Sequence, residues 1–184
     1  MHHNDQTNII LTGFMGTGKT TVGTLLAQRL HRPFIDTDQM IETRQGMTIP
    51  AIFADLGESA FRQMEAELAQ ELGDKKGLVI STGGRFMLNP ANVDVLSKGR
   101  IFCLIGTPQE IVARLASDPN NRRPLLNVPD PGEQITRLLQ ERQQGYQQFV
   151  TLATDGRQPE EIAENLFQLL QKNPPSKNPN LSDG

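Results

Sequence analysis

Short apolar runs alternate with amphipathic stretches along most of the chain. Five runs are short and nearly continuously apolar, which is typical of strands that are buried on both faces of a sheet. The strands expected from these runs cover residues 8–12, 33–36, 78–82, 101–105 and 150–153. Between the runs, apolar residues recur every three or four positions, which predicts helices over 19–30, 61–72, 135–150 and 162–170.

Local signals mark where some of these helices begin and end. Gly73 follows the second helix and is expected to stop it. Thr107-Pro108-Gln109-Glu110 has the form of a capping box, with proline at the first helical position. Strands that alternate with helices predict βαβ units, and therefore an α/β fold with a mostly parallel sheet between two helical layers. Ligands of such sheets bind beyond the C-terminal ends of the strands.

Composition narrows the class of protein. The chain has 184 residues, 36% of them hydrophobic, and no apolar run approaches the ~18 residues of a membrane span. The net charge of −3 argues against a general nucleic-acid binder, which usually carries a basic excess. Cys103 is the single cysteine, which excludes a disulfide framework or a four-cysteine zinc site. The N-terminus is polar and has no secretory signal, so we expect a cytoplasmic protein.

The two ends of the chain are expected to be tails. Residues 173–184 contain three prolines and one apolar side chain, too little to offset the entropy lost on ordering, so we predict a disordered C-terminal tail. Residues 1–172 are then one domain, and a self-contained domain of this size predicts a monomer.

One motif carries a specific chemistry. Residues 13–20, GFMGTGKT, satisfy G-x-x-x-x-G-K-[ST] between an expected strand and an expected helix, as in a phosphate-binding P-loop. Glycines let backbone N–H groups turn toward phosphate oxygens, and the helix N-terminus adds partial positive charge. Lys19 is expected to reach the β- and γ-phosphates of a nucleotide, and the Thr20 hydroxyl to ligate Mg²⁺. The chain has no Asn-Lys-x-Asp guanine motif, which disfavours a common GTPase.

An acidic pair follows the second expected strand, in the sequence Asp36-Thr37-Asp38. Residues two apart in an extended segment project to one side, so both carboxylates can face the crevice beside the phosphate loop. One would belong to the magnesium shell, and the other would orient a hydroxyl or accept its proton. The alternative is that Asp38 only caps the next helix.

Three places in the chain carry arginines of interest. Arg142 lies on the apolar face of its helix, where a guanidinium needs an anion, either a bound carboxylate or an internal acidic partner. Arg62 lies beside the apolar stripe of the second helix. Residues 117–128 are polar and turn-rich and include Arg122 and Arg123. This segment is either a mobile lid that closes over the transferred phosphoryl group or a solvated loop.

In order, the segments GFMGTGKTT, DTD, GESAFRQME, STGG and RRPLL, followed by the Arg142/Tyr146 spacing, resemble the shikimate kinase family of P-loop, nucleoside-monophosphate-kinase-like proteins. The resemblance covers residues 9–170. It implies a five-stranded parallel sheet of order 2-3-1-4-5 and transfer of the ATP γ-phosphate to the 3-hydroxyl of shikimate.

The resemblance also implies roles for individual residues. Catalysis would fall to Lys19, Asp38 and Arg123, and the metal would be held by Thr20 and Asp36. The ATP-binding residues would be Gly16, Thr17, Gly18, Lys19, Thr20, Thr21, Arg114, Arg123, Arg157 and Pro159. The substrate would be held by Asp38, Arg62, Gly83, Gly84 and Arg142.

The chain departs from the family pattern after the third expected strand. Where the family usually has three glycines, this chain has Gly83-Gly84-Arg85. Arginine disfavours the positive-φ conformations open to glycine, so either position 85 does not need them or the turn differs. Arg85 could point to solvent or tune the choice of acid. Two other functions stay open, a gluconate or nucleoside-monophosphate kinase and an inactive nucleotide-binding regulatory module.

Overall fold

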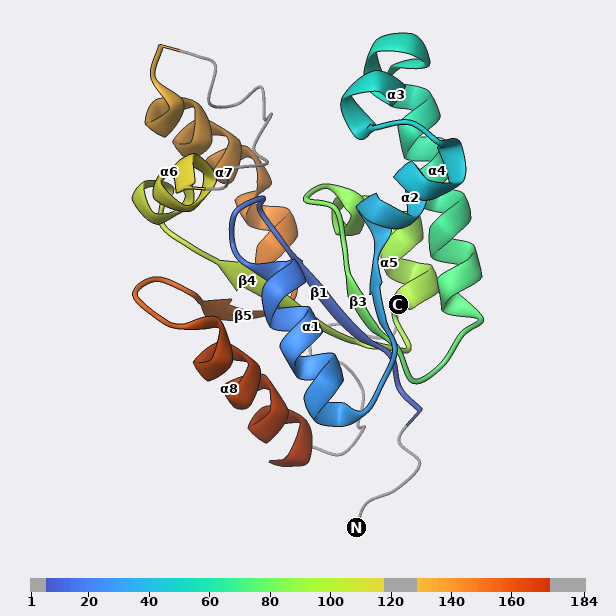
Figure 1. Ribbon diagram of the computed structural model, residues 1–184, viewed down its shortest axis with the longest axis vertical. Helices are drawn as coiled ribbons and strands as arrows, with labels where there is room; N and C mark the ends of the chain where they lie inside the picture. Colours follow the sequence, from blue (N-terminus) through green and yellow to red (C-terminus); the bar gives the residue numbers. More distant parts are fainter. Residues whose placement is uncertain (1–5, 118–128, 173–184) are drawn as a thin grey trace.

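Five parallel strands form the centre of the structure, in the order β2-β3-β1-β4-β5. The structure is a computed structural model that describes residues 6–117 and 129–172 (Figure 1). The strands are β1 (Ile9–Gly13), β2 (Phe34–Asp36), β3 (Val79–Ser81), β4 (Arg100–Ile105) and β5 (Val150–Ala153). The parallel sheet, its strand order and the place of each strand confirm the predictions made from the sequence.

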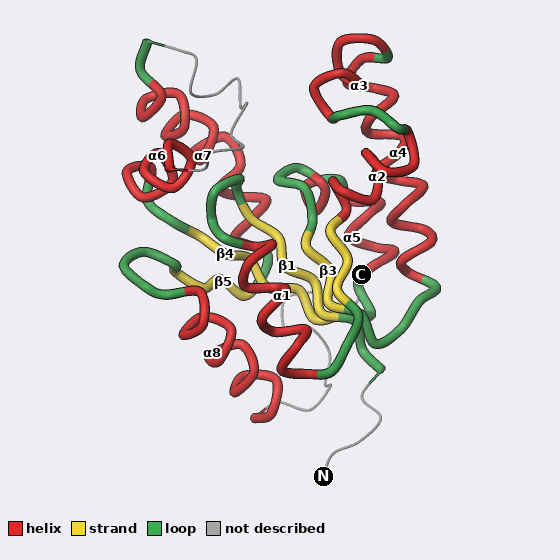
Figure 2. Tube along the Cα trace, viewed as in Figure 1, coloured by secondary structure: helices red, strands yellow, loops and turns green. Residues whose placement is uncertain are grey.

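The alternation of side chains along the strands divides the core into two layers. Ile10, Ile80 and Ile101 pack under the helices of one face, whereas Ile9 and Leu11 pack against those of the other. The second face is covered by α1 (Lys19–Leu30) and α8 (Pro159–Lys172). The first is covered mainly by α4 (Gly57–Gly73), α5 (Pro90–Leu96) and α7 (Pro131–Gln147), so that helices flank a central sheet (Figure 2).

Four short elements were not predicted. They are α2 (Thr37–Gln45), α3 (Ile49–Asp55), the 3₁₀-helix η1 (Phe86–Leu88) and α5. Each α-helix among them begins with a side-chain cap: Asp36 caps α2, Thr48 caps α3 and Asn89 caps α5. The helices α2, α3 and α4 rise together above the sheet on one side, and α6 (Pro108–Ser117) and α7 rise on the other (Figure 1).

The structure corrects the ends of two predicted helices and one half of a predicted cap. Gly73 is the last residue of α4 and is not in the left-handed conformation of a stop; it is a glycine because a Cβ there would lie 2.5 Å from Val95 Cγ1. Phe149 and Val150 lie beyond α7, and Val150 opens β5. Half of the predicted capping box forms: Thr107 Oγ1 accepts from the Glu110 N–H, but the Thr107 N–H donates to Asp155 Oδ1.

Cys103 is fully buried in β4, and burial raises the pKa of its thiol to about 12, which is typical of an unreactive core cysteine. Within 6–117 and 129–172, no helix is both long and apolar enough to cross a bilayer. Residues 118–128 of the predicted lid, with Arg122 and Arg123, and the predicted tail at 173–184 lie outside the described residues.

Candidate active site

The loop between β1 and α1 has the backbone of a phosphate cradle. Gly16 and Gly18 have φ of 77° and 87°, in the left-handed region that glycine adopts without strain, and Gly18 directly precedes α1. Gly13 has φ of 129°, and a Cβ there would lie 2.2 Å from the Leu104 carbonyl oxygen. The helix N-terminus therefore opens at the C-terminal end of β1, as the P-loop motif predicts.

Lys19 and Thr17 are held inside this loop. The Lys19 Nζ donates to the Phe14 carbonyl at 2.8 Å, and the Thr17 hydroxyl donates to the same oxygen at 2.7 Å. Both side chains are buried although Thr20 and Thr21, the next residues of α1, are exposed. The ammonium group is thus fixed on the inner wall of the loop, where phosphate oxygens would lie.

Asp36 links the phosphate loop to the next helix. Its Oδ2 accepts from the Thr20 hydroxyl at 2.8 Å, and its Oδ1 accepts from the N–H groups of Asp38 and Gln39. Mg²⁺ prefers oxygen ligands and usually keeps several waters, so one hydroxyl and one carboxylate beside the phosphates are a suitable donor set. Thr20 and Asp36 therefore fit a magnesium site.

Asp38 has a different backbone conformation from the one predicted. Thr37 begins α2, so Asp38 lies in the first turn of a helix and not in an extended segment, and the capping residue is Asp36. Asp38 is half-buried, and its buried Oδ1 has no hydrogen-bond partner among the described residues. Burial, followed by the nearby charge of Asp36, raises the pKa of Asp38 to about 6 although Lys19 opposes this.

Glu65 of α4 is a second buried carboxylate at the same place. Its Oε1 is unpartnered within the described part of the chain, and burial raises the pKa of this carboxyl above its usual range. A Cβ built on Gly83 would lie 2.6 Å from Asp38 Oδ1 and 3.2 Å from Glu65 Oε1. The Gly83 N–H donates to Thr37 Oγ1 at 3.0 Å. The lack of a side chain at Gly83 therefore leaves space for both carboxylates.

Arg62 is held by two acidic neighbours on its own helix. Its Nη2 lies 3.0 Å from Glu58 Oε1, and its Nη1 lies 2.6 Å from Glu65 Oε2. The guanidinium also lies 5.2 Å from the centre of the Phe61 ring. The positive charge of Arg62 is therefore compensated by two carboxylates.

Arg142 differs, because no carboxylate of the described residues pairs with it. It is half-buried and lies over the Phe14 ring of the phosphate loop, 5.0 Å from the ring centre. Its Nη1 lies 3.6 Å from a Cβ built on Gly84. One turn further along α7, the buried Tyr146 hydroxyl donates to the Gly84 carbonyl at 2.6 Å. An internal acidic partner for Arg142, the alternative left open by the sequence, is not present in the described residues.

Arg85 has an ordinary backbone conformation and an acidic partner. Its φ of −109° and ψ of −5° suit any residue, so position 85 does not need glycine. The side chain is about half exposed, and its Nη1 lies 3.1 Å from Glu58 Oε1. Arg85 therefore reaches across to α4 and is not simply turned to solvent.

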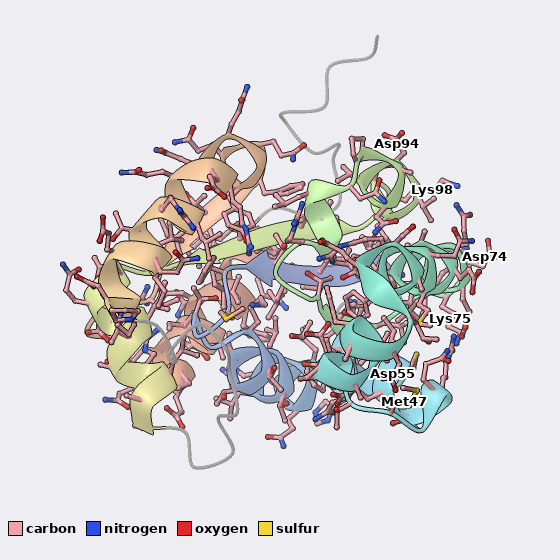
Figure 3. The ribbon with its side chains drawn as sticks, turned by 90° about the horizontal axis from the view of Figure 1, so that it is seen from above. Met47, Asp55, Asp74, Lys75, Asp94 and Lys98 are labelled. Atoms are coloured by element: carbon pink, nitrogen blue, oxygen red, sulfur yellow. The ribbon has the colours of Figure 1, made fainter. Side chains whose placement is uncertain are left out.

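These residues gather at one edge of the sheet, between two groups of helices. Seen from above, α6 and α7 lie on one side of the strand ends, and α2 to α4, marked by Met47 and Asp55, lie on the other (Figure 3). The phosphate loop, Asp36, Asp38 and Gly83-Gly84 follow the C-terminal ends of three neighbouring strands, β1, β2 and β3. This is the edge at which the sequence predicted ligand binding.

Comparison with known proteins decides the family. A family model described as shikimate kinase matches residues 15–171. A shikimate kinase of Thermodesulfovibrio yellowstonii is 45% identical over 167 residues, which are 90% of this chain and 95% of that protein. The chain belongs to the shikimate kinase family.

Solved structures agree with this membership. A shikimate kinase from Acinetobacter baumannii, solved in complex with shikimate, superposes with a TM-score of 0.84 at 36% identity and covers 93% of this chain and 96% of its own. A gluconokinase from Sinorhizobium meliloti has a TM-score of 0.55 at 17% identity, over 91% of this chain and 99% of its own. The second likeness shows a shared fold alone.

The residues assigned to the adenine side by resemblance to the family lie close to one another. Arg114 of α6 donates to the Thr154 hydroxyl at 2.9 Å and to its carbonyl at 2.6 Å. Arg157 donates to the Ala153 carbonyl at 3.3 Å, and Pro159 opens α8. A Cβ on Gly16 would touch Leu115, the neighbour of Arg114, so this group adjoins the phosphate loop.

Three residues of this shikimate kinase site were missed as candidates. Glu58 and Glu65 flank Arg62 at helical spacing, i−4 and i+3, and that spacing was a signal for ion pairs. Tyr146 was noted only for its spacing from Arg142. The hydrogen bond from its hydroxyl to Gly84 joins residues 62 positions apart, so no local pattern could predict it.

Proposed function

We propose that this protein transfers the γ-phosphate of ATP to the 3-hydroxyl of shikimate. The proposal rests mainly on one arrangement in a member of the shikimate kinase family. Arg142, a guanidinium without an acidic partner among the described residues, lies over the phosphate loop beside Gly84, and the Asp38 carboxylate lies beside Gly83. A small anionic alcohol held there would have its carboxylate on the arginine and a hydroxyl near the carboxylate.

In this proposal, Asp38 acts on the attacking hydroxyl. The hydroxyl oxygen forms a bond to the γ-phosphorus as the bond from that phosphorus to the bridging oxygen of ADP breaks, and the hydroxyl proton passes to Asp38. A pKa of about 6 keeps Asp38 ionised at neutral pH while leaving it able to take a proton. Its Oδ1 is buried beside Gly83, so in this proposal the proton passes to Oδ2, the other oxygen of the carboxylate.

The phosphate loop supplies the positive electrostatics. Residues 16–21 would bind the ATP phosphates through backbone N–H groups, and Lys19 would leave the Phe14 carbonyl for the β- and γ-phosphates. Mg²⁺, held by Thr20 and Asp36, would neutralise part of the phosphate charge. Arg123 would approach the transferred group, and Arg114, Arg157 and Pro159 would flank the adenine.

The acid is held from both walls. Arg142 would bind the carboxylate from α7, and Arg62 would bind it from α4. The Gly84 N–H would donate to the substrate while Tyr146 fixes the Gly84 carbonyl. We further propose that the enzyme works as a cytoplasmic monomer, which light scattering of the purified protein would test.

The decisive experiment is a coupled assay with ATP, Mg²⁺ and a panel of shikimate, gluconate and nucleoside monophosphates. We expect ADP release with shikimate alone, with the 3-phosphate identified by ³¹P nuclear magnetic resonance. Turnover of gluconate or of a nucleotide in preference to shikimate would contradict the proposal. Binding of ATP and shikimate without product would instead support a regulatory module.

A further inference from the structure

Glu58 Oε1 serves two arginines from different elements. It accepts from Arg62 Nε at 3.2 Å and Nη2 at 3.0 Å, and from Arg85 Nη1 at 3.1 Å. Arg62 lies on α4 with Glu58, whereas Arg85 follows β3 and stands next to Gly84. This shared oxygen therefore links helix α4 to the segment that follows strand β3.

Three of the five N–H groups of Arg62 donate to its two acidic neighbours. Glu58 takes the edge formed by Nε and Nη2, and Glu65 takes Nη1. A carboxylate binds a guanidinium best through two parallel N–H groups of one edge. Glu65 is 2% exposed and Glu58 is about half exposed, so the edge that can be released to a ligand at lower cost is the one on Glu58.

Releasing that edge creates an electrostatic problem. Once Arg62 turns to the carboxylate of an acid, Glu58 keeps its own negative charge close to the incoming anion, and like charges repel. The Arg62 contact is the largest cause that keeps the pKa of Glu58 below its usual range, so Glu58 would lose its principal counter-ion. A second cation on the same oxygen removes this difficulty, and Arg85 is that cation.

We propose that Arg85 is a positioning residue that holds Glu58 while Arg62 binds the substrate carboxylate, and that Arg85 thereby sets the affinity for the acid. The inference rests on the proposed function, because it takes the acid to be the ligand of Arg62. Arg85 acts through Glu58 and does not touch the substrate. Its role therefore depends on its charge and on the presence of Glu58, more than on the shape of a guanidinium.

A double-mutant cycle tests this dependence. Arg85→Ala should raise KM for shikimate about three- to tenfold, with kcat within about twofold of the starting enzyme. In an E58Q background the same substitution should change KM by less than about twofold, because no charge remains to be compensated. Arg85→Lys should keep KM within about threefold. Titration of shikimate without nucleotide should show the same ratios in Kd.

The control is Arg44→Ala, which removes another half-exposed arginine, paired at 2.5 Å with Glu71 and not with Glu58 or Glu65. It should leave KM and kcat unchanged. Thermal unfolding of every variant should stay within about 2 °C, because exposed ion pairs contribute little to stability.

Two results would overturn the proposal. If Arg85→Ala raised KM equally in the starting enzyme and in the E58Q variant, Arg85 would contact the acid directly. No rise in either background would mean that Arg85 is a solvated surface residue. Failure of the proposed function is separate, because the starting enzyme would then not phosphorylate shikimate at all.

Discussion

Asp38 and Glu65 each turn one carboxylate oxygen toward the same point beside Gly83, and neither oxygen has a hydrogen-bond partner in the described part of the chain. Burial raises the pKa of both groups, that of Asp38 to about 6. Both oxygens are buried, so two carboxylates lie close together here without a hydrogen-bond donor from the described residues. This costs stability and makes Asp38 a stronger base than an exposed aspartate.

Replacing Asp38 by Asn should stabilise the protein near neutral pH. A carboxyl whose pKa is raised from 3.8 to about 6 on folding contributes stability below about pH 4, and this contribution is lost as the pH rises through 6. Asparagine does not ionise, so its contribution to stability does not change over this pH range. We expect Asp38→Asn to be more stable than the original by about 2 kcal/mol at pH 7.5 and equal to it below pH 4. Urea unfolding from pH 4 to 8 measures this difference.

The same variant should lose kcat by about 10²- to 10⁴-fold, because it removes the group that we propose as the proton acceptor. Asp55→Asn, which changes an exposed carboxylate on α3 (Figure 3), is the control and should alter neither quantity. A stability gain of equal size at pH 4 and pH 7.5 would show that the cause is not the titration of Asp38.

Gly83→Ala and Gly84→Ala form a matched pair that tests the space for the carboxylates. The new methyl group at position 83 would lie 2.6 Å from Asp38 Oδ1, so Asp38 must move, whereas at 84 the nearest atoms are 3.6 Å away. A displacement of a reacting group by about 1 Å costs on the order of 10²-fold in rate. We expect a loss of kcat of that size for Gly83→Ala and an unfolding temperature lowered more than by Gly84→Ala. Equal effects on unfolding temperature would contradict the steric argument.

Arg142→Ala should weaken binding of the acid. A hydrogen-bonded charge pair in a crevice contributes about 1.5–3 kcal/mol, so KM for shikimate should rise roughly 10- to 100-fold with a smaller change in kcat. Arg137→Ala, on the exposed side of the same helix, is the control. Steady-state kinetics at fixed ATP measure both. If the apparent affinity of Arg142→Ala for the acid were unchanged, the clamp would have to lie elsewhere.

Lys19→Met should separate catalysis from folding. Loss of the ammonium group removes charge from the phosphates, and one such donor is worth about 10²- to 10³-fold in kcat. The methionine chain still fills the buried space, so the unfolding temperature should fall by only a few degrees. Lys75→Met, which breaks a surface ion pair with Glu71, should leave kcat unchanged. A collapse of the fold in Lys19→Met would contradict the assignment.

The positions of the strands and of the P-loop were predictable from the sequence. The continuously apolar runs around Ile10, Ile80 and Leu104 located the strands, because strands covered on both faces have no polar side. The strand order came from the family resemblance. The P-loop was specific because its glycine positions are set by backbone geometry that other residues cannot adopt without strain.

The features that were not predicted are mostly short helices and contacts between residues distant in the sequence. Helix α2 has one fully buried apolar side chain, Ile41, so it carries almost no stripe, although Asp36 before it was a capping signal. The sequences Thr48-Ile49-Pro50 and Asn89-Pro90 likewise marked the starts of α3 and α5. The contacts of Arg85 with Glu58 and of Tyr146 with Gly84 depend on tertiary packing, which no local pattern encodes.

Asp36 divides its two oxygens between two tasks. Oδ1 caps the helix that carries Asp38, and Oδ2 accepts the Thr20 hydroxyl. A divalent cation held by Thr20 and Asp36 would draw on Oδ2, because Oδ1 already accepts two backbone N–H groups, so the exchange of one nucleotide for the next would not require the start of that helix to unwind. Asp38, the proton acceptor of our proposal, would then keep its position from one turnover to the next.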